Sequence, residues 1–344
     1  MTPEDSQARA RVGSADRLDL MWAFLVHLGY NFWSDTVPRF WANHPTPELL
    51  KNRGAADHLR FDEATWLRVS ATLPAKGVNT VVIDLGEGLV YPSHPELAVR
   101  GSWSAEKLER ELSRLRAMGL TPIPKLNFST SHDTWLGEYG RMVSTPAYYR
   151  VVEDLIGDVI EIFGKPPLFH LGYDEENAAN QSQYELTVVR QGELWWHDFL
   201  HITGLVEKRG VRPWVWSDKL WHHPDEFLNR MPKSVLQSNW YYEGEFDLSK
   251  DWPTKNRAKA FLTLERAGFD QVPTASNSRN RDALRNMVSF CTREISPERL
   301  RGFLMTTWRK MDSEFEPVQR DAVERINNAA FLLMSGSTVR FSTR

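Results

Sequence analysis

The chain has 344 residues, of which 41% are hydrophobic and 25% charged, and its formal net charge is -3. This balance is typical of a globular protein and gives no electrostatic basis for binding nucleic acid or an acidic membrane. A single cysteine, Cys291, excludes an internal disulfide and a cysteine-based zinc cluster.

The N-terminus is polar and lacks the apolar core of a signal peptide. No apolar run approaches the ~20 residues needed to cross a bilayer. The sequence as given therefore predicts a soluble, cytoplasmic protein that begins with a loose tail over residues 1–17.

Short apolar or β-branched runs alternate with longer amphipathic stretches along the chain. The runs predict strands over 20–29, 79–86, 121–128, 167–174, 212–218, 234–241, 270–277 and 302–308. Apolar residues at three- and four-residue spacing between them predict helices, most clearly over 105–119, 147–164 and 195–210. Several stretches end in a glycine, as helix C-termini prefer: Gly77, Gly119, Gly164, Gly210 and Gly268.

Eight strand–helix units in a chain of this length favour one α/β domain, a (β/α)8 TIM barrel over residues 18–344. A doubly wound sheet usually has fewer strands. Residues 30–60, which include Trp33 and Trp41, form a long first loop with room for a lid or a binding wall. Exposed tryptophans there would suit a homodimer contact as well as a substrate.

In barrels of this kind the active site forms where the strands end and the following loops begin. Polar and aromatic side chains gather at the predicted strand ends: His27, Asn31, Asp84, Glu87, Lys125, Asn127, His132, His170, Asp174, Glu175, Trp216, Asp218, Trp240, Tyr241, Tyr242 and Trp308. The strand bodies stay apolar, so the distribution indicates a site rather than scattered surface charge.

The fourth predicted strand ends in three consecutive acids, Asp174, Glu175 and Glu176. Because side chains alternate along a strand, Asp174 and Glu175 should point in different directions and have different roles. A carboxyl group beside aromatic walls and a second carboxylate is suited to general acid catalysis. The alternative is that the acids cap the next helix, the role we expect for Glu176.

The segment FHLGYDEE (169–176) resembles the His-x-Gly-Gly-Asp-Glu motif of the glycoside hydrolase family 20 (GH20) β-N-acetylhexosaminidases. Three further segments resemble strands of that family: KGVNTVVIDLGEG (76–88), GLTPIPKLNFSTSH (119–132) and WVWSDKLW (214–221). Trp308 is similar to its closing tryptophan. The likeness covers roughly 18–335 and implies a barrel that binds carbohydrate and requires no cofactor.

By this resemblance, Glu175 would protonate the glycosidic oxygen. Asp174 would orient and stabilise the substrate's 2-acetamido group, which attacks the anomeric carbon. A retaining enzyme with a protein nucleophile needs a second acid about 5 Å away, and the predicted strand 270–277 ends without one. The resemblance thus implies removal of a terminal β-linked N-acetylhexosamine by substrate-assisted catalysis.

The resemblance also assigns the walls of the sugar pocket. Trp216, Trp240 and Trp308 would enclose the acetamido group. Either Tyr241 or Tyr242 would donate a hydrogen bond to the acetamido oxygen. His170 would support Asp174 from behind.

The sequence departs from the family pattern at three places. Tyr173 replaces the second glycine of the motif, and Lys125 replaces a glutamate near the sugar. The first strand lacks the family's sugar-binding arginine, so His27 or Asn31 would have to take its role. These departures concern the substrate more than the fold.

Two other functions fit the same residues. His27, Asp84, Glu87, His132, His170, Asp174 and Glu175 could bind manganese or zinc, as in metal-dependent sugar isomerase or hydrolase barrels. Against this, no His-x-His pair ends the first strand, and the later strands add few carboxylates. A carbohydrate-binding barrel without catalysis would keep the tryptophans and still depart at the three positions above.

Overall fold

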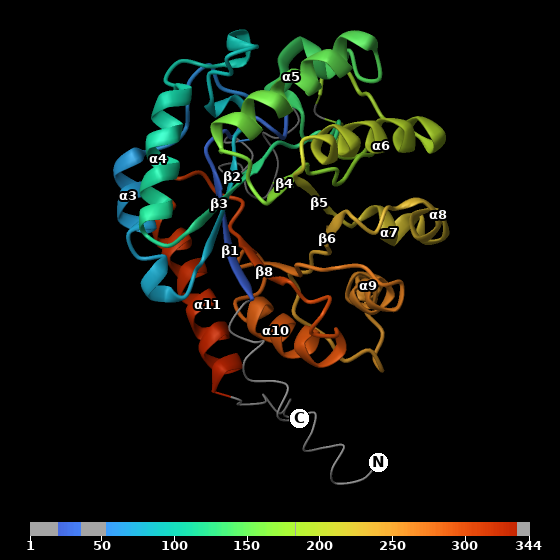
Figure 1. The fold of residues 1–344 in the computed structure, drawn as a ribbon. Coiled ribbons are helices and arrows are strands. Elements are labelled where there is room, and N and C mark those ends of the chain that lie inside the picture. The colour runs from blue at the N-terminus through green and yellow to red at the C-terminus, as the bar shows by residue number, and fades with distance from the viewer. Residues whose placement is uncertain (1–19, 36–52, 183, 336–344) are drawn as a thin grey trace, which may run out of the picture.

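The computed structural model describes residues 20–35, 53–182 and 184–335, and the description that follows concerns these residues. Eight parallel strands form one sheet at the centre, and helices surround it (Figure 1). The strands are β1 (Met21–His27), β2 (Thr80–Asp84), β3 (Thr121–Lys125), β4 (Leu168–His170), β5 (Arg212–Trp216), β6 (Leu236–Ser238), β7 (Thr274–Ser276) and β8 (Gly302–Thr306).

α-Helices or 3-10 segments follow most strands. The α-helices are α3 (Glu63–Ser70), α4 (Ala105–Ala117), α5 (Pro146–Ile162), α6 (Gly192–Lys208), α7 (Lys219–His222), α8 (Pro224–Arg230), α9 (Lys255–Arg266), α10 (Ala283–Glu294) and α11 (Glu316–Met334). The 3-10 turns are η3 (Pro74–Lys76), η4 (Gly86–Gly88), η5 (Pro95–Leu97) and η6 (Thr134–Arg141).

Side-chain caps explain where several helices begin. Asp62 accepts from the backbone N–H of Ala64 at the start of α3, and Ser104 accepts from Lys107 at the start of α4. Thr145 caps α5, whose first residue is Pro146. Each cap satisfies a donor that the helix itself leaves free.

The eight predicted strands and the (β/α)8 architecture are confirmed. Each observed strand lies inside its predicted range, and the helices α4, α5 and α6 match their ranges to within three residues at either end. All five glycines predicted at helix C-termini have left-handed backbone angles, with φ between 63° and 80°. Cys291 is buried in α10, as a small apolar residue would be.

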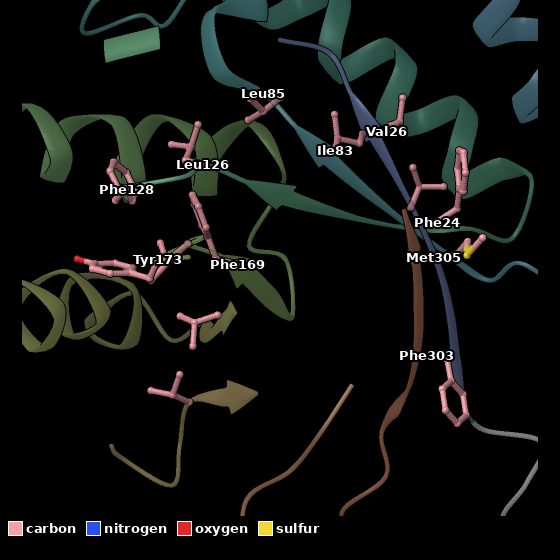
Figure 2. Close-up of a cluster of buried hydrophobic side chains, with 14 of the residues drawn as sticks. Phe24, Val26, Ile83, Leu85, Leu126, Phe128, Phe169, Tyr173, Phe303 and Met305 are labelled. Carbon is pink, nitrogen blue, oxygen red and sulfur yellow. The ribbon is translucent and has the colours of Figure 1, made fainter. Parts of the chain in front are cut away.

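Two apolar layers hold the barrel together, because successive side chains of a strand point to opposite faces. The smaller layer fills the barrel interior and includes Ala23, Leu25, Val82, Ile123, Trp214 and Leu304. The larger layer lies between the strands and the helices and includes Phe24, Ile83, Phe169 and Met305 (Figure 2). Together they fix the strand ends as a rigid platform.

Seven of the eight strand junctions are ladders, in the order β6-β5-β4-β3-β2-β1-β8-β7. The eighth, between β6 and β7, is made by two isolated bridges, Gln237 to Gln271 and Trp240 to Thr274. Backbone hydrogen bonds accompany them, including Val272 N to Gln237 O at 2.9 Å and Tyr241 N to Thr274 O at 3.1 Å. The barrel therefore closes, with its least regular seam at this junction.

Several expectations fall partly or wholly outside the described residues, namely the tail 1–17, Trp41 and the middle of the first loop. Both ends of that loop are described, and they meet at a bridge between Ser34 and Gly54. Within the described part of the chain, none of the helices combines the length and apolar character needed to span a membrane.

Candidate active site

A layer of four polar side chains crosses the first four strands. The register pairs His27 with Asp84, Asp84 with Lys125, and Lys125 with His170. Asp84 Oδ2 lies 2.7 Å from Lys125 Nζ and 2.9 Å from His27 Nδ1. Burial raises the pKa of Asp84, but Lys125 and His27 outweigh it and lower the pKa, so that Asp84 stays ionised. Asp84 thus joins His27 and Lys125 at the ends of β1, β2 and β3.

His170 acts on the backbone rather than on Asp174. Its Nδ1 accepts from the N–H of Gly172 at 3.1 Å, and its ring lies against Trp216, with 4.3 Å between ring centres. Burial holds the pKa of His170 well below its usual value, and Lys125 lowers it further. The direct support that we expected from His170 for Asp174 is therefore supplied by other side chains.

The chain leaves β4 in a left-handed conformation, with φ of 71° at Gly172, 71° at Tyr173 and 57° at Glu175. A Cβ atom at Gly172 would lie 1.9 Å from Asn127 Oδ1. That oxygen accepts from the N–H groups of Tyr173 and Ser129 at 3.2 and 3.0 Å. Left-handed angles at non-glycine residues cost about 1 kcal/mol or more each. Asn127 thus fixes a strained turn that displays both acids.

Tyr173 points away from the barrel mouth and into the layer between strands and helices (Figure 2). Its ring lies edge-on to Trp195 and Phe199 of α6, with 5.6 and 5.0 Å between ring centres. The Arg190 guanidinium lies 5.2 Å from the same ring. The bulky residue at the motif's second glycine therefore leaves the mouth open.

Asp174 is buried and held from two sides. Its Oδ1 accepts from Asn127 Nδ2 at 2.8 Å, and its Oδ2 lies 3.4 Å from His132 Nε2. Burial would raise the pKa of Asp174, but His132, Lys125 and Asn127 lower it to about 2. Asp174 is a fixed carboxylate at neutral pH.

His132 links the two acids. Its Nε2 lies 3.4 Å from Asp174 Oδ2 and 3.4 Å from Glu175 Oε2, and its Nδ1 contacts the Phe32 carbonyl at 3.2 Å. Burial lowers the pKa of His132, but both carboxylates outweigh it and raise the pKa to about 10. The imidazolium is therefore the cation between Asp174 and Glu175.

Glu175 has the more accessible side chain of the two acids, with 39% exposed against 10% for Asp174. Its backbone N–H donates to Asp218 Oδ2 at 2.9 Å. Burial raises the pKa of Asp218, and the Asp174 carboxylate raises it further, to about 7. Asp218 thus holds the backbone of Glu175, while the Glu175 carboxyl group reaches the solvent side.

A cavity of about 340 Å³ opens at this place. Asp174, Glu175 and His132 line it together with four aromatic side chains, those of Trp33, Trp240, Tyr242 and Trp308. Trp240 stacks on Tyr242 with 5.2 Å between ring centres, and Trp308 Nε1 donates to Tyr242 Oη at 3.1 Å. The cavity therefore combines a carboxylate pair with flat apolar surfaces suited to a sugar ring.

Tyr241 and Trp216 do not line this cavity. Tyr241 is fully buried in the outer layer, edge-on to Phe246 with 5.2 Å between ring centres, so its predicted role as an alternative to Tyr242 is replaced by packing. Trp216 is buried in the interior layer of the barrel, 6.1 Å from Trp308 between ring centres.

Asn31 and Glu87 organise the first loop instead of facing the cavity. Asn31 exchanges two 2.9 Å hydrogen bonds with the backbone of Ala56. Glu87 Oε1 accepts from the N–H groups of Tyr30 and Asn31 at 2.7 and 3.1 Å. Like His27, Asp84 and Lys125, these two predicted binding residues are buried and do not line the cavity.

Glu176 makes a buried ion pair rather than a helix cap. Arg190 Nη2 lies 2.6 Å from Glu176 Oε2, and Arg190 Nη1 lies 3.2 Å from Asp198 Oδ2 of α6. The helix-capping role expected for Glu176 is wrong, since α6 begins at Gly192 and its N-cap residue is Gln191. The pair ties the loop after β4 to the helix layer.

Several cavity residues were missed by sequence reasoning: Arg53, Ser278, Arg279 and Arg309. Arg309 follows Trp308 at a strand end, so its position was a usable signal. Arg53 comes from the far end of the first loop, where spacing says nothing about proximity. Trp33, expected only as part of a lid or wall, lines the cavity as well.

A larger hollow of about 490 Å³ lies between the loops after β3 and β4, lined among others by Asp133, Arg141, Gln181 and Tyr184. It contains neither Asp174 nor Glu175. Because it lacks the paired acids and the aromatic wall, the smaller cavity is the better candidate site.

The side chains of His132, Asp174 and Glu175 could together hold a metal ion. One ligand atom each of His132, Asp174 and Glu175 lie within 4.8 Å of one another. To bind a metal, His132 would have to release its proton, because only the neutral imidazole is a ligand. In the metal-free site both carboxylates raise the pKa of His132 to about 10 and so oppose that release.

Neither a family model nor a curated protein matches this sequence. Solved structures do match. A GH20 exo-β-N-acetylglucosaminidase from Vibrio harveyi superimposes with a TM-score of 0.60 at 14% identity, over 93% of this chain and 58% of that one. The β-N-acetylhexosaminidase from Bacteroides fragilis gives a TM-score of 0.59 at 12% identity, over 89% of this chain and 65% of the other.

Dispersin B gives a TM-score of 0.51 at 15% identity, over 79% of this chain and 95% of that chain. The resemblance to GH20 is thus confirmed at the level of fold: the chain is a (β/α)8 barrel of the kind seen in these enzymes. It spans 58% and 65% of the Vibrio and Bacteroides proteins.

Proposed function

We propose that this chain is a divergent GH20 glycoside hydrolase that removes a terminal β-linked N-acetylhexosamine by substrate-assisted, retaining catalysis. The carrying observation is the strained turn after β4, which presents Asp174 and Glu175 side by side to one aromatic cavity, with His132 3.4 Å from each. The fold shared with GH20 enzymes supports the same assignment.

Glu175 is the proton donor in this proposal. Its side chain is the more accessible of the two acids and lies in the cavity. It protonates the glycosidic oxygen as the bond to the leaving group breaks, and then takes a proton from the water that completes hydrolysis. The contact between its N–H and Asp218 keeps the carboxyl group in place.

The attacking group belongs to the substrate. Among the residues that the structure describes, Asp174 and Glu175 are the only carboxylates that line the cavity, and they are neighbours in sequence. Asp174 accepts a hydrogen bond from the acetamido N–H and stabilises the positive charge that develops as the acetamido oxygen attacks C1. Tyr242 then donates to that oxygen, with Trp240 and Trp308 as walls.

The test compares aryl β-glycosides with a 2-acetamido and a 2-hydroxy group, in the wild type, Glu175→Gln and Asp174→Asn. Only the acetamido substrate should be hydrolysed, and each variant should lose about 10²- to 10⁴-fold in kcat. Because protonation matters more for poor leaving groups, Glu175→Gln should harm an alkyl glycoside more than a 4-nitrophenyl glycoside.

Glu207→Gln, on the exposed side of α6, is the matched control and should keep full activity. A chelator should leave turnover unchanged, since no step needs a metal. Equal hydrolysis of the 2-hydroxy substrate, or undiminished turnover in Glu175→Gln, would disprove the mechanism.

A further inference from the structure

Three guanidinium groups line the cavity beside the two acids, those of Arg53, Arg279 and Arg309. Arg279 is already paired, since its Nη1 lies 2.9 Å from Glu243 Oε1. Arg53 and Arg309 make no ion pair with any carboxylate in the described part of the chain. The site therefore contains two cations that no carboxylate of the described residues neutralises by direct contact.

Aromatic rings, not acids, hold these two side chains in position. The Arg53 guanidinium lies 4.9 Å from the centre of the Trp33 ring, and its Nε is buried with no hydrogen-bond partner among the described residues. Arg309 lies 5.6 Å from the centre of the Phe315 ring and donates to the Trp308 carbonyl at 3.1 Å. Contacts of this kind orient an arginine and leave its charge available to a ligand.

The two arginines also act on each other. Burial lowers the pKa of Arg53, and the charge of Arg309 lowers it further, although Tyr30 and Glu175 oppose the effect. Holding like charges together in a partly enclosed cavity opposes folding unless an anion joins them. Two unpaired arginines held close together are typical of a site that binds an anionic ligand.

Neither acid of the site forms an ion pair with Arg53 or Arg309 among the described residues, although the charge of Glu175 acts on Arg53. Asp174 is engaged by Asn127 and His132, and the second carboxylate, Glu175, lies against His132. In the proposed mechanism Glu175 also carries a proton when it acts. Neither acid is therefore a permanent partner for Arg53 or Arg309.

We propose that the sugar bound in this cavity carries an anionic substituent, a sulfate, phosphate or carboxylate group, which Arg53 and Arg309 bind. This inference rests on the proposed function and specifies its substrate class. The planar guanidinium fork matches the oxygens of such groups with two parallel hydrogen bonds, which a lone hydroxyl group cannot accept in the same way. A neutral sugar would leave the repulsion between the arginines in place.

The experiment measures kcat/KM for 4-nitrophenyl N-acetyl-β-glucosaminide and its 3-, 4- and 6-sulfates, its 6-phosphate and the corresponding uronic acid. At least one charged substrate should be preferred by about tenfold or more at low salt, chiefly through KM, and the preference should fall as salt rises. The substrate with the highest kcat/KM identifies the preferred anion and its position on the sugar.

Arg53→Gln and Arg309→Gln should each reduce the ratio of charged to neutral kcat/KM by about tenfold. Arg53→Lys and Arg309→Lys should retain part of the preference, because they keep the charge but lose the fork. The control is Arg110→Gln, on the exposed face of α4, which should leave the ratio unchanged.

Equal or better hydrolysis of the neutral substrate would overturn this inference and leave the proposed function intact. A loss of both activities in the same proportion in the arginine variants would do so too, since the arginines would then bind sugar hydroxyls. If no substrate is hydrolysed, calorimetry can compare the affinity for free N-acetylglucosamine with the affinity for its sulfates, and so test the anion site without turnover. A charge preference that Arg53→Gln removes would support the anion site even though the proposed hydrolysis fails, and equal binding would reject it.

Discussion

Only glycine fits position 172, for two separate reasons. Its φ of 71° is strained for any side chain, and a Cβ atom would collide with Asn127, the residue that also holds Asp174. A change at this position therefore affects the fold and the site at once.

We predict that Gly172→Ala lowers the free energy of unfolding by several kcal/mol and reduces kcat, because Asn127 must move away from Asp174. The matched control is Gly164→Ala, where φ is 63° but no atom lies within 4 Å of the added methyl group. The control should cost only about 1–2 kcal/mol and keep full activity. Urea unfolding and kinetics of both variants check this, and equal costs would contradict it.

Asp218 makes the site sensitive to pH. Its pKa of about 7 in the folded state lies above the 3.8 of an ordinary aspartate. Between pH 3.8 and 7 the Asp218 carboxyl group is protonated in the folded state and ionised in the unfolded state. Its proton therefore stabilises the fold fully below pH 3.8, and this stabilisation is lost as the pH rises through 7. The predicted loss is at most about 4 kcal/mol.

Asp218→Asn keeps an acceptor for the N–H of Glu175 and cannot ionise. We predict that this variant is more stable than the wild type at pH 8 and of similar stability at pH 4. Denaturant unfolding from pH 4 to 8 measures the difference. Parallel pH profiles for the two proteins would show that Asp218 does not titrate in this range.

Sequence reasoning placed the acids, His132 and Trp240 near one another because each follows a strand. It left Tyr241 and Tyr242 undecided, although the period of two along a strand sets Trp240 and Tyr242 on the same side. Arg53 could not have been found, since only folding brings the far end of the first loop to the cavity.

At the level of elements, strands end earlier than their apolar runs suggest. The run 167–174 predicts a long fourth strand, but β4 stops at His170 because Gly172 and Tyr173 adopt left-handed angles. β6 and β7 are equally short. Apolar runs locate strands by burial, and the residues beyond these ends are buried too, so composition alone could not mark the boundaries.

The layer of His27, Asp84 and Lys125 ties β1, β2 and β3 together by charge. We predict that Lys125→Met lowers the free energy of unfolding by about 3–5 kcal/mol, because Asp84 remains buried without its main cation. The double variant Asp84→Asn with Lys125→Met should recover much of that loss.

Urea unfolding of Lys125→Met, Asp84→Asn and the double variant gives the coupling free energy between Asp84 and Lys125. Lys250→Met serves as the control, since the pair of Lys250 and Asp247 is exposed and its removal should change little. A Lys125→Met variant as stable as the wild type would show that the layer does not depend on this ion pair.

For the molecule as a whole, barrel closure is uneven. β1 pairs with both neighbours over four or five residues, whereas β6 and β7 meet only through isolated bridges. The sequence predicted eight strands and hence a closed barrel, but it could not show which seam is weakest, because that depends on register rather than on composition.

We predict that the barrel opens first between β6 and β7. Amide hydrogens of Val272, Thr274 and Tyr241 should exchange faster than those of Leu25 and Val82 in the centre of the sheet. Ser238→Ala should enlarge the difference, because Ser238 Oγ donates to the Val272 carbonyl at 2.6 Å. Uniform protection around the barrel would contradict this.

The tryptophans around the cavity also make occupancy visible. Trp33, Trp240 and Trp308 line it. A sugar that displaces water from these indoles should shift their emission to shorter wavelength. Intrinsic fluorescence would then report binding directly, in variants whose catalytic acids have been removed and without any chromogenic label on the ligand.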